Sequence, residues 1–383
     1  MKACLASWLV FKVAGHGNLI SPPCRNAIDR FLPGFQGGKS PSDSCNCGDS
    51  RRGCQEGVRA PGGGQPCLWF SQGCIIGCPR CSGIGSHSGG PHSDNKGLCN
   101  STARPTLPKW AWTMNRKAAE GSADDTYRLN PWRAPGRAPV SDACGMAGGT
   151  TRAHAGPGVA IFSDSKFAKM GDLGSEVLRP YPSGAIWSAG TAVEVSWGIR
   201  YNHGGGYQYR LCPANEKLTE ECFMKTPLKF VQTKQVLQWK NGTRFPINGT
   251  FVNEGTWPVG STWAMNPIPR IDFDSHSSGQ PAGFAGCSFV HGAPTGPSCR
   301  QFNPPCPWDE GWYSQPGRQH SVDVEGACSG DWTGGVIIDQ VVIPADLAPG
   351  QYVLGWRWDC EETSQVWASC ADVTVVTATG TFV

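Results

Sequence analysis

Short runs of alternating hydrophobic and polar residues fill the second half of the chain and are separated by turn residues. In Gln351–Trp358, alternation places every second residue on one face, as in a half-buried strand: Tyr352, Leu354, Trp356 and Trp358. Four further runs have β character: Thr191–Trp197, Tyr207–Cys212, Gly335–Ile343 and Ser369–Val376. Several short strands with turns between them predict an all-β antiparallel sandwich rather than a parallel α/β sheet.

Glycine and proline interrupt the chain so often that long helices are excluded as its main architecture. The 383 residues contain 51 Gly and 31 Pro without a Gly-X-Y period, so the chain is turn-rich and not collagen-like. Residues 24–100 and 270–330 are both rich in Cys, Gly and Pro, with little periodicity. We therefore expect one domain over residues 16–376, with a Cys-rich insertion at about 45–100 and a short tail at 377–383.

The chain starts with a short apolar stretch that we interpret as part of a signal peptide. Ala3–Phe11 is far shorter than the roughly 20 residues that span a bilayer. Val13 and Gly15 occupy positions −3 and −1 of a cleavage site, so residues 1–15 would be removed and the mature chain would begin at His16. A secreted, extracellular protein is predicted.

Cysteine usage supports the same interpretation. Removal of Cys4 leaves 18 of the 19 cysteines, an even number that can close as nine disulfides in an oxidising compartment. Cys74, Cys78 and Cys81 also have spacings compatible with a zinc site. In a secreted chain with an even number of cysteines, disulfides are the favoured interpretation.

The mature chain is nearly neutral, which bears on its partners. It keeps 31 of the 33 Lys and Arg residues against 30 Asp and Glu, and it has no long basic run. Nucleic acid and anionic membranes are therefore not expected as partners, and uncharged ligands are favoured.

His16 at the predicted new N-terminus is the most informative candidate for chemistry. Its free amine and its own Nδ1 can close a six-membered chelate on a metal ion, and an imidazole from elsewhere would complete a planar site of three nitrogens. Such ligands in tetragonal geometry suit Cu(II). The alternative is that His16 is an ordinary residue after a wrongly assigned signal.

Seven other histidines could supply the third nitrogen: His87, His92, His154, His203, His276, His291 and His320. His203 is the best placed, because it lies between two strand-like runs and precedes Gly204–Gly206, which would let backbone and a bulky substrate approach closely. His154 is the second choice, and an ordinary turn histidine remains the alternative at position 203.

Three segments together resemble one family. They are His16-Gly17 after a signal, Asn202-His203-Gly-Gly-Gly206, and Gly355–Val373, which contains a Gln-x-aromatic-x-x-Cys pattern. In this order they resemble the copper-dependent lytic polysaccharide monooxygenases. Residues 45–100 are similar to the Cys-rich segment of eukaryotic members with chitin-binding type 4 domains.

The resemblance implies an immunoglobulin- or fibronectin III-like β-sandwich with long disulfide-rich loops, and a monomer. It implies one copper ion held by the amine and Nδ1 of His16 and by Nε2 of His203. The copper would use O2 or H2O2 and an external electron donor to oxidise a glycosidic C–H bond. The substrate would be insoluble polysaccharide, either chitin or cellulose.

Two further residues match the family's site. Gln365 matches the glutamine that hydrogen-bonds to oxygen at the copper, and its alternative is a solvated strand residue. Trp367 stands where the family usually has an axial Tyr or Phe. Indole has a donor N–H and no lone pair, so Trp367 would shield the axial face without binding copper. It would equally suit a core position beside Cys370 and its disulfide.

Flat polysaccharide surfaces suit a nearly uncharged protein with exposed aromatic rings. Tyr201, Tyr207 and Trp69 are the candidates for such a surface. Two other functions remain open on the sequence alone. One is a non-catalytic extracellular carbohydrate-binding protein, and the other is an extracellular protein that captures copper with the same nitrogens.

Overall fold

The fold is described from a computed structural model. It describes these residues: 16–26, 68–84, 129–151, 162, 164, 167–201, 204–238, 244–267, 288–290, 293–295, 336–361 and 363–377. The predicted signal peptide at 1–15 lies outside the described residues, as does most of the predicted Cys-rich insertion.

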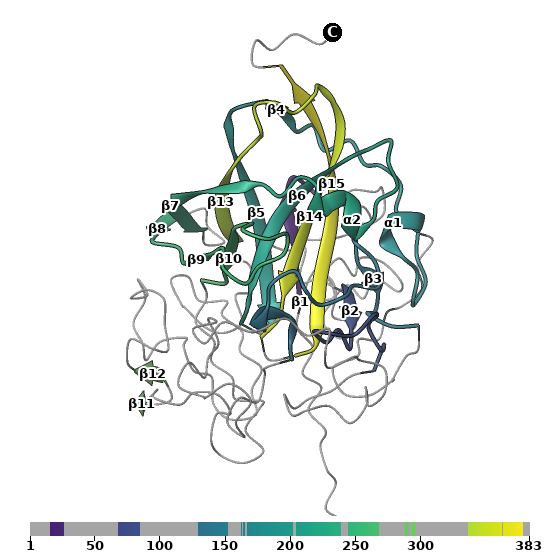
Figure 1. The fold of residues 1–383 in the computed structure, drawn as a ribbon, viewed down its shortest axis with the longest axis vertical. Coiled ribbons are helices and arrows are strands. Elements are labelled where there is room, and N and C mark those ends of the chain that lie inside the picture. Colours follow the sequence, from purple (N-terminus) through teal and green to yellow (C-terminus); the bar gives the residue numbers. More distant parts are fainter. Residues whose placement is uncertain are drawn as a thin grey trace, which may run out of the picture.

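Two antiparallel sheets form a sandwich (Figure 1). The first has five strands in the order β1 (His16–Ser21), β5 (Ala192–Tyr201), β13 (Val336–Val342), β7 (Lys229–Gln238) and β8 (Arg244–Ile247). The second has its strands in the order β3 (Met146–Ala147), β2 (Trp69–Gln72), β15 (Gln365–Val376), β14 (Gly350–Asp359), β6 (Gly206–Pro213), β10 (Trp263–Met265) and β9 (Phe251–Val252). The prediction of an all-β sandwich is confirmed.

Smaller elements complete the described fold. Strand β4 (Ile186–Ser188) pairs in parallel with β15, and β11 (Ser288–Val290) pairs with β12 (Ala293–Thr295). The helices are short: α1 (Gly174–Val177), α2 (Glu220–Met224) and the 3-10 helix η5 (Pro131–Arg133). All five predicted strands are present, as β5, β6, β13, β14 and β15.

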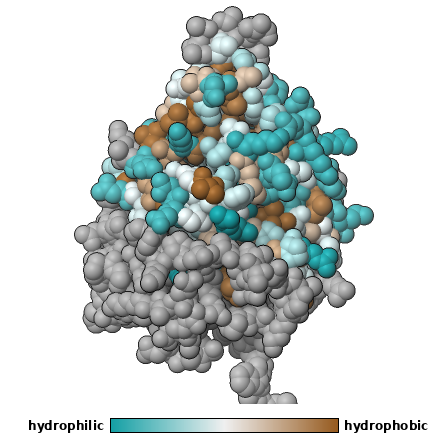
Figure 2. Space-filling view, in the orientation of Figure 1, coloured by the Kyte–Doolittle hydropathy of each residue, from teal (hydrophilic) through white to brown (hydrophobic). Residues whose placement is uncertain are grey.

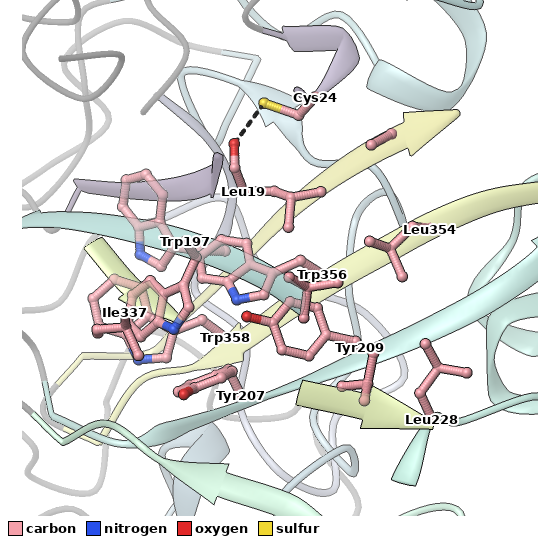
Figure 3. Close-up of a cluster of buried hydrophobic side chains, with 14 of the residues drawn as sticks. Leu19, Cys24, Trp197, Tyr207, Tyr209, Leu228, Ile337, Leu354, Trp356 and Trp358 are labelled. Atoms are coloured by element: carbon pink, nitrogen blue, oxygen red, sulfur yellow. Dashed lines mark hydrogen bonds between the residues drawn. The ribbon is translucent and has the colours of Figure 1, made fainter. Parts of the chain in front are cut away.

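Indole and phenol rings fill the space between the two sheets (Figure 3). Trp197 of β5 lies 5.1 Å from Trp356 and 5.3 Å from Trp358 between ring centroids, and 4.7 Å from Tyr207. All four rings are fully buried. Aromatic contacts of this kind add to the stabilisation from buried area. The inner face predicted for Gln351–Trp358 is therefore part of the core.

The expectation that Gln351–Trp358 is buried on one face only is wrong. Its outer face is also covered, because Val353 packs with the Cys212–Cys222 disulfide and with Phe223 of α2. Gly355 allows this cover, since a Cβ there would lie 2.8 Å from the Phe223 ring. The sequence pattern did not reveal this second layer, because α2 is a single turn of helix.

The segment from residue 68 to 84 also differs from the loop expected there. Trp69–Gln72 forms β2, which pairs with β15 and with β3 inside the larger sheet. Leu68, Trp69 and Phe70 are buried, so this part of the Cys-rich region belongs to the core.

Three disulfides join described residues: Cys74–Cys81, Cys144–Cys370 and Cys212–Cys222. The first confirms a disulfide, rather than a zinc site, at Cys74 and Cys81. The second confirms the bridge expected at Cys370, and it ties β15 to residues 226 positions away in the sequence.

Candidate functional site

The first residue of the predicted mature chain begins a strand. His16 opens β1, and its backbone lies opposite Tyr201, the last residue of β5. His203 lies outside the described residues, two positions beyond Tyr201 in the sequence. The described residues nearest to it in the sequence are Tyr201, at the end of β5, and Gly204, ahead of β6. The structure therefore describes the residues that flank His203 in the sequence, but not His203 itself.

One indole contacts the neighbours of both histidines. Trp358 of β14 is fully buried, and its Nε1 donates a hydrogen bond of 2.8 Å to the carbonyl oxygen of Gly204. On the other side, a Cβ at Gly17 would lie 3.0 Å from Cζ3 of Trp358. Gly17, which follows His16, and Gly204, which follows His203, therefore both contact the side chain of Trp358.

The glycines after His203 are required by the protein's own backbone. Gly204 and Gly205 have φ values of 62° and 75°, the left-handed region that glycine adopts readily. A Cβ at Gly205 would lie 2.0 Å from the carbonyl oxygen of Asp359, and one at Gly206 would lie 2.3 Å from the ring of Trp132. Close approach was expected at these glycines, and the structure shows β14 and η5 as the approaching groups.

Gln365 lies at the same end of the sandwich. The Leu19 backbone N donates to Ser369 Oγ at 3.4 Å, and Gly17 contacts Trp358, whose partner across the strand pair is Trp367. A step of two residues along β1 thus matches a step of two along β15. Gln365 is the first residue of β15, two positions before Trp367, so it lies at the end of that strand nearest the start of β1.

The amide of Gln365 is fully buried and held at both ends. Its Oε1 accepts a hydrogen bond of 3.1 Å from Thr363 Oγ1, and its Nε2 donates at 2.7 Å to Oε1 of Gln72. A solvated strand residue is thereby excluded. Gln72 was not found from the sequence, because it is 293 residues away and no motif marks it.

Trp367 is a core residue in this structure. It is fully buried and stacks on Phe70 with ring centroids 4.2 Å apart, and its centroid lies 6.3 Å from that of Trp358. An additional role in shielding the axial face of a copper ion stays a prediction.

Two of the three residues predicted for a substrate surface are buried, so that prediction is wrong for them. Tyr207 is on the inner face of β6, where its hydroxyl donates to Asp339 Oδ1 at 3.1 Å. Trp69 packs edge-on against Phe162. The side chain of Tyr201 lies outside the described residues. The alternation of each strand turns these rings inward, which a list of aromatic residues does not show.

Few large hydrophobic side chains are exposed on the described surface, and hydrophilic residues lie over much of the coloured part of the face in Figure 2. Those exposed are Ile84, Ile186, Trp257 and Val259. The Arg137 guanidinium lies 4.6 Å from the centroid of the Trp257 ring and covers part of it. No helix in the described part of the chain is long and apolar enough to cross a membrane.

A buried carboxylate lies between the sheets. Asp339 of β13 accepts hydrogen bonds from Tyr207, from Tyr209 at 3.0 Å and from Gln235 Nε2 at 3.0 Å. Burial raises the pKa of Asp339 from 3.8 to about 6, although the three donors act in the opposite direction. Burial and the nearby carboxylate also raise the pKa of both tyrosines.

A second charged cluster covers the outer face of β14. Glu220 of α2 pairs with Arg210 and, at 2.6 Å, with Arg357, which also contacts Asp359 at 2.6 Å. Burial alone would raise the pKa of Glu220, but the two guanidinium groups lower it to about 2. Asp359 accepts from the backbone N of Gly136 at 2.7 Å. These contacts fix the end of β14 that touches Gly205.

Among the described residues, no group of three or more His, Cys, Asp or Glu is placed to hold a metal ion. The predicted copper site needs only two histidines and an amine, and His203 is not among those residues. The second-choice ligand, His154, also lies outside them.

Comparison with known proteins gives distant likenesses only. No family model matches the chain. A lytic polysaccharide monooxygenase AA15 from Thermobia domestica in the Cu(I) state has 14% identity and a TM-score of 0.21 over 50% of this chain and 62% of that one. An AA10 lytic polysaccharide monooxygenase from Streptomyces lividans has 10% identity and a TM-score of 0.20 over 53% and 63%. A chitin binding domain from Burkholderia pseudomallei has 12% identity and a TM-score of 0.28 over 94% and 100%. The chain thus spans less than two thirds of the first two structures.

Proposed function

We propose that this chain is a secreted, copper-dependent lytic polysaccharide monooxygenase. The observation that carries the proposal is the convergence of Gly17 and Gly204 on Trp358, next to the two histidines of the predicted site. The sequence motifs that resemble the family supply the chemistry. The described disulfides support an oxidising, extracellular compartment.

One copper ion would be held by the amine and Nδ1 of His16 and by Nε2 of His203. Three nitrogen donors suit tetragonal Cu(II), and Gly17 provides the close approach to the core that an added Cβ would obstruct. When bound and reduced by an external donor, copper supplies the one-electron chemistry that activates O2 or H2O2 toward a glycosidic C–H bond.

The protein side chains position and shield this site. Gln365 presents an amide whose orientation is fixed by Thr363 and Gln72. Trp358 and Trp367 form an apolar floor that excludes water from the inner side. Fixed groups of this kind orient a reacting centre more sharply than mobile ones.

The proposed substrate is insoluble chitin or cellulose, bound by a monomer. A nearly neutral mature chain fits such an uncharged polymer. With Tyr207 and Trp69 buried, Tyr201 remains as the aromatic candidate beside the site, and its backbone pairs with that of His16.

The test starts from secreted protein whose N-terminus is sequenced. A mature chain that begins at His16 should bind one Cu(II) with the paramagnetic resonance of three nitrogen ligands and, with ascorbate, release oxidised oligosaccharides from chitin or cellulose. His203→Ala should weaken copper binding by orders of magnitude and abolish release. Protein that keeps Met1 should lack the signal.

Other outcomes contradict the proposal. Binding to insoluble polymer without oxidised products would indicate a non-catalytic carbohydrate-binding protein. Copper uptake without products or polymer binding would indicate a copper-capturing protein. Unchanged copper affinity in His203→Ala would redirect the ligand to His154 or another histidine.

A further inference from the structure

We propose that Trp358 is a positioning residue that holds the two copper-binding segments at a fixed separation. This inference rests on the proposed function. It adds a residue that would not touch the metal but would act through the backbone on either side of it. The juxtaposition that carries it is a single indole wedged between Gly17 and the carbonyl oxygen of Gly204.

The two contacts differ in kind and act on different segments. The hydrogen bond from Nε1 to the Gly204 oxygen, at 2.8 Å, fixes the backbone that follows His203. The six-membered ring of the indole lies under Gly17 and limits how far β1 can sink toward the core. Removing the N–H would release the first segment, and removing ring volume would release the second.

Trp358 is itself held firmly enough to serve as a spacer. Its ring lies 5.3 Å from Trp197, 6.3 Å from Trp356 and 6.3 Å from Trp367 between centroids. Its chain neighbours Arg357 and Asp359 are bound to each other on the opposite face of β14. Interiors packed in this way transmit a displacement rather than absorb it.

Trp356 offers a matched control two residues away. It lies on the same face of β14, is equally buried and also packs against Trp197. Its Nε1, however, has no hydrogen-bond partner in the described part of the chain. Trp→Phe at either position removes similar ring volume, but only at Trp358 does it remove a bond to a copper-binding segment.

The experiment compares Trp358→Phe and Trp356→Phe in correctly processed protein. Thermal unfolding of the metal-free forms measures fold stability, competition titration measures Cu(II) affinity, and paramagnetic resonance reports ligand geometry. We expect similar losses of stability. We expect Trp358→Phe alone to weaken Cu(II) binding about 10- to 100-fold, as loss of a ligand-supporting contact does, and to change the hyperfine splitting.

A second variant protects the test against misfolding. Gly17→Ala leaves Trp358 and every donor nitrogen in place but adds a Cβ 3.0 Å from the ring. We expect at least a tenfold loss of Cu(II) affinity from this methyl group, and this variant decides the matter if Trp358→Phe does not fold.

The outcomes separate this inference from the proposed function. If processed wild-type protein binds no Cu(II) with the three-nitrogen signature, both fall together. If the wild type binds copper and Trp358→Phe has the same Cu(II) affinity and spectrum as wild type and Trp356→Phe, the positioning role is overturned and the proposed function stands. Where Trp358→Phe does not fold, the same conclusion follows if Gly17→Ala keeps that affinity and spectrum.

Discussion

Single side chains are oriented by their hydrogen-bond partners, and Gln365 is the clearest example. An amide can rotate to present either its oxygen or its nitrogen, and the neighbours decide which. Thr363 donates to the oxygen and Gln72 accepts from the nitrogen, so both ends of Gln365 are assigned by its surroundings. The surroundings of Asp339 likewise determine the pH at which its carboxyl group ionises.

Gln72→Leu removes the acceptor for Gln365 Nε2. We expect oxidative turnover to fall at least tenfold with little change in Cu(II) affinity, and the free energy of unfolding to fall by about 1–3 kcal/mol because a buried donor loses its partner. Gln351→Leu is the control, since Gln351 makes a comparable contact with Thr374 on the exposed part of β14. Equal effects on turnover in the two variants would contradict the role given to Gln72.

Asp339→Asn should remove a pH dependence of stability. Because the pKa is raised from 3.8 unfolded to about 6 folded, Asp339 binds its proton more tightly in the folded protein. Protonation of Asp339 therefore adds about 3 kcal/mol to the free energy of unfolding. This contribution is complete below pH 3.8 and is lost as the pH rises through 6. Urea unfolding of both proteins at pH 4 and pH 7 measures it. Parallel pH profiles would contradict this assignment.

Strand β14 contacts the residues that follow both histidines of the candidate site. Its inner face carries Trp356 and Trp358 between the sheets, while its outer face carries Arg357 in the cluster around Glu220. Its last residues touch Gly205 through the Asp359 carbonyl. A substitution that disturbs either face of β14 would therefore displace Gly204 and Gly205, which follow His203.

Glu220→Gln leaves Arg210 and Arg357 buried without their shared carboxylate. We expect a loss of about 3–5 kcal/mol, as when one partner of a buried ion pair is removed. Glu216→Gln breaks the exposed pair with Lys225 and should cost less than about 1 kcal/mol. The lowered pKa means that the wild-type contribution is present above pH 4.5 and is lost as pH falls through about 2. Similar losses in both variants at pH 7 would refute this.

The strands could be predicted because alternation is a local property, as in Gln351–Trp358. The cover on the outer face of β14 and the inward turn of Tyr207 could not, because each depends on segments distant in the sequence. The motifs identified His16, His203 and Gln365 as candidates. They gave no sign of Gln72 or Trp358 as supports, since those roles arise only when the sheets pack.

Across the whole molecule, crosslinks differ in what they hold together. Cys144–Cys370 closes a loop of 226 residues and joins β15 to the segment before β3, whereas Cys212–Cys222 closes a loop of 10. The longer loop restricts the unfolded chain more. The two bridges also lie in one buried cluster with Val353, so each contributes to the same outer layer.

Replacing both cysteines of each bridge by Ala tests this difference. Loop-closure entropy predicts a loss of about 5 kcal/mol for Cys144–Cys370 and about 3 kcal/mol for Cys212–Cys222. Denaturant unfolding under non-reducing conditions measures both. A larger loss from the shorter loop would show that local packing, rather than restriction of the unfolded chain, dominates.

Strand β1 forms the border of the five-stranded sheet in the described part of the molecule, and it begins at His16. Chain ends usually fray first, and an edge strand with unpaired backbone groups can pair with a strand from another molecule. In the proposed mature protein, the copper ion would hold the start of β1 in place. We therefore expect it to slow amide hydrogen exchange over Gly17–Leu19. We therefore expect the metal-free protein to aggregate more readily on storage than the copper-bound protein.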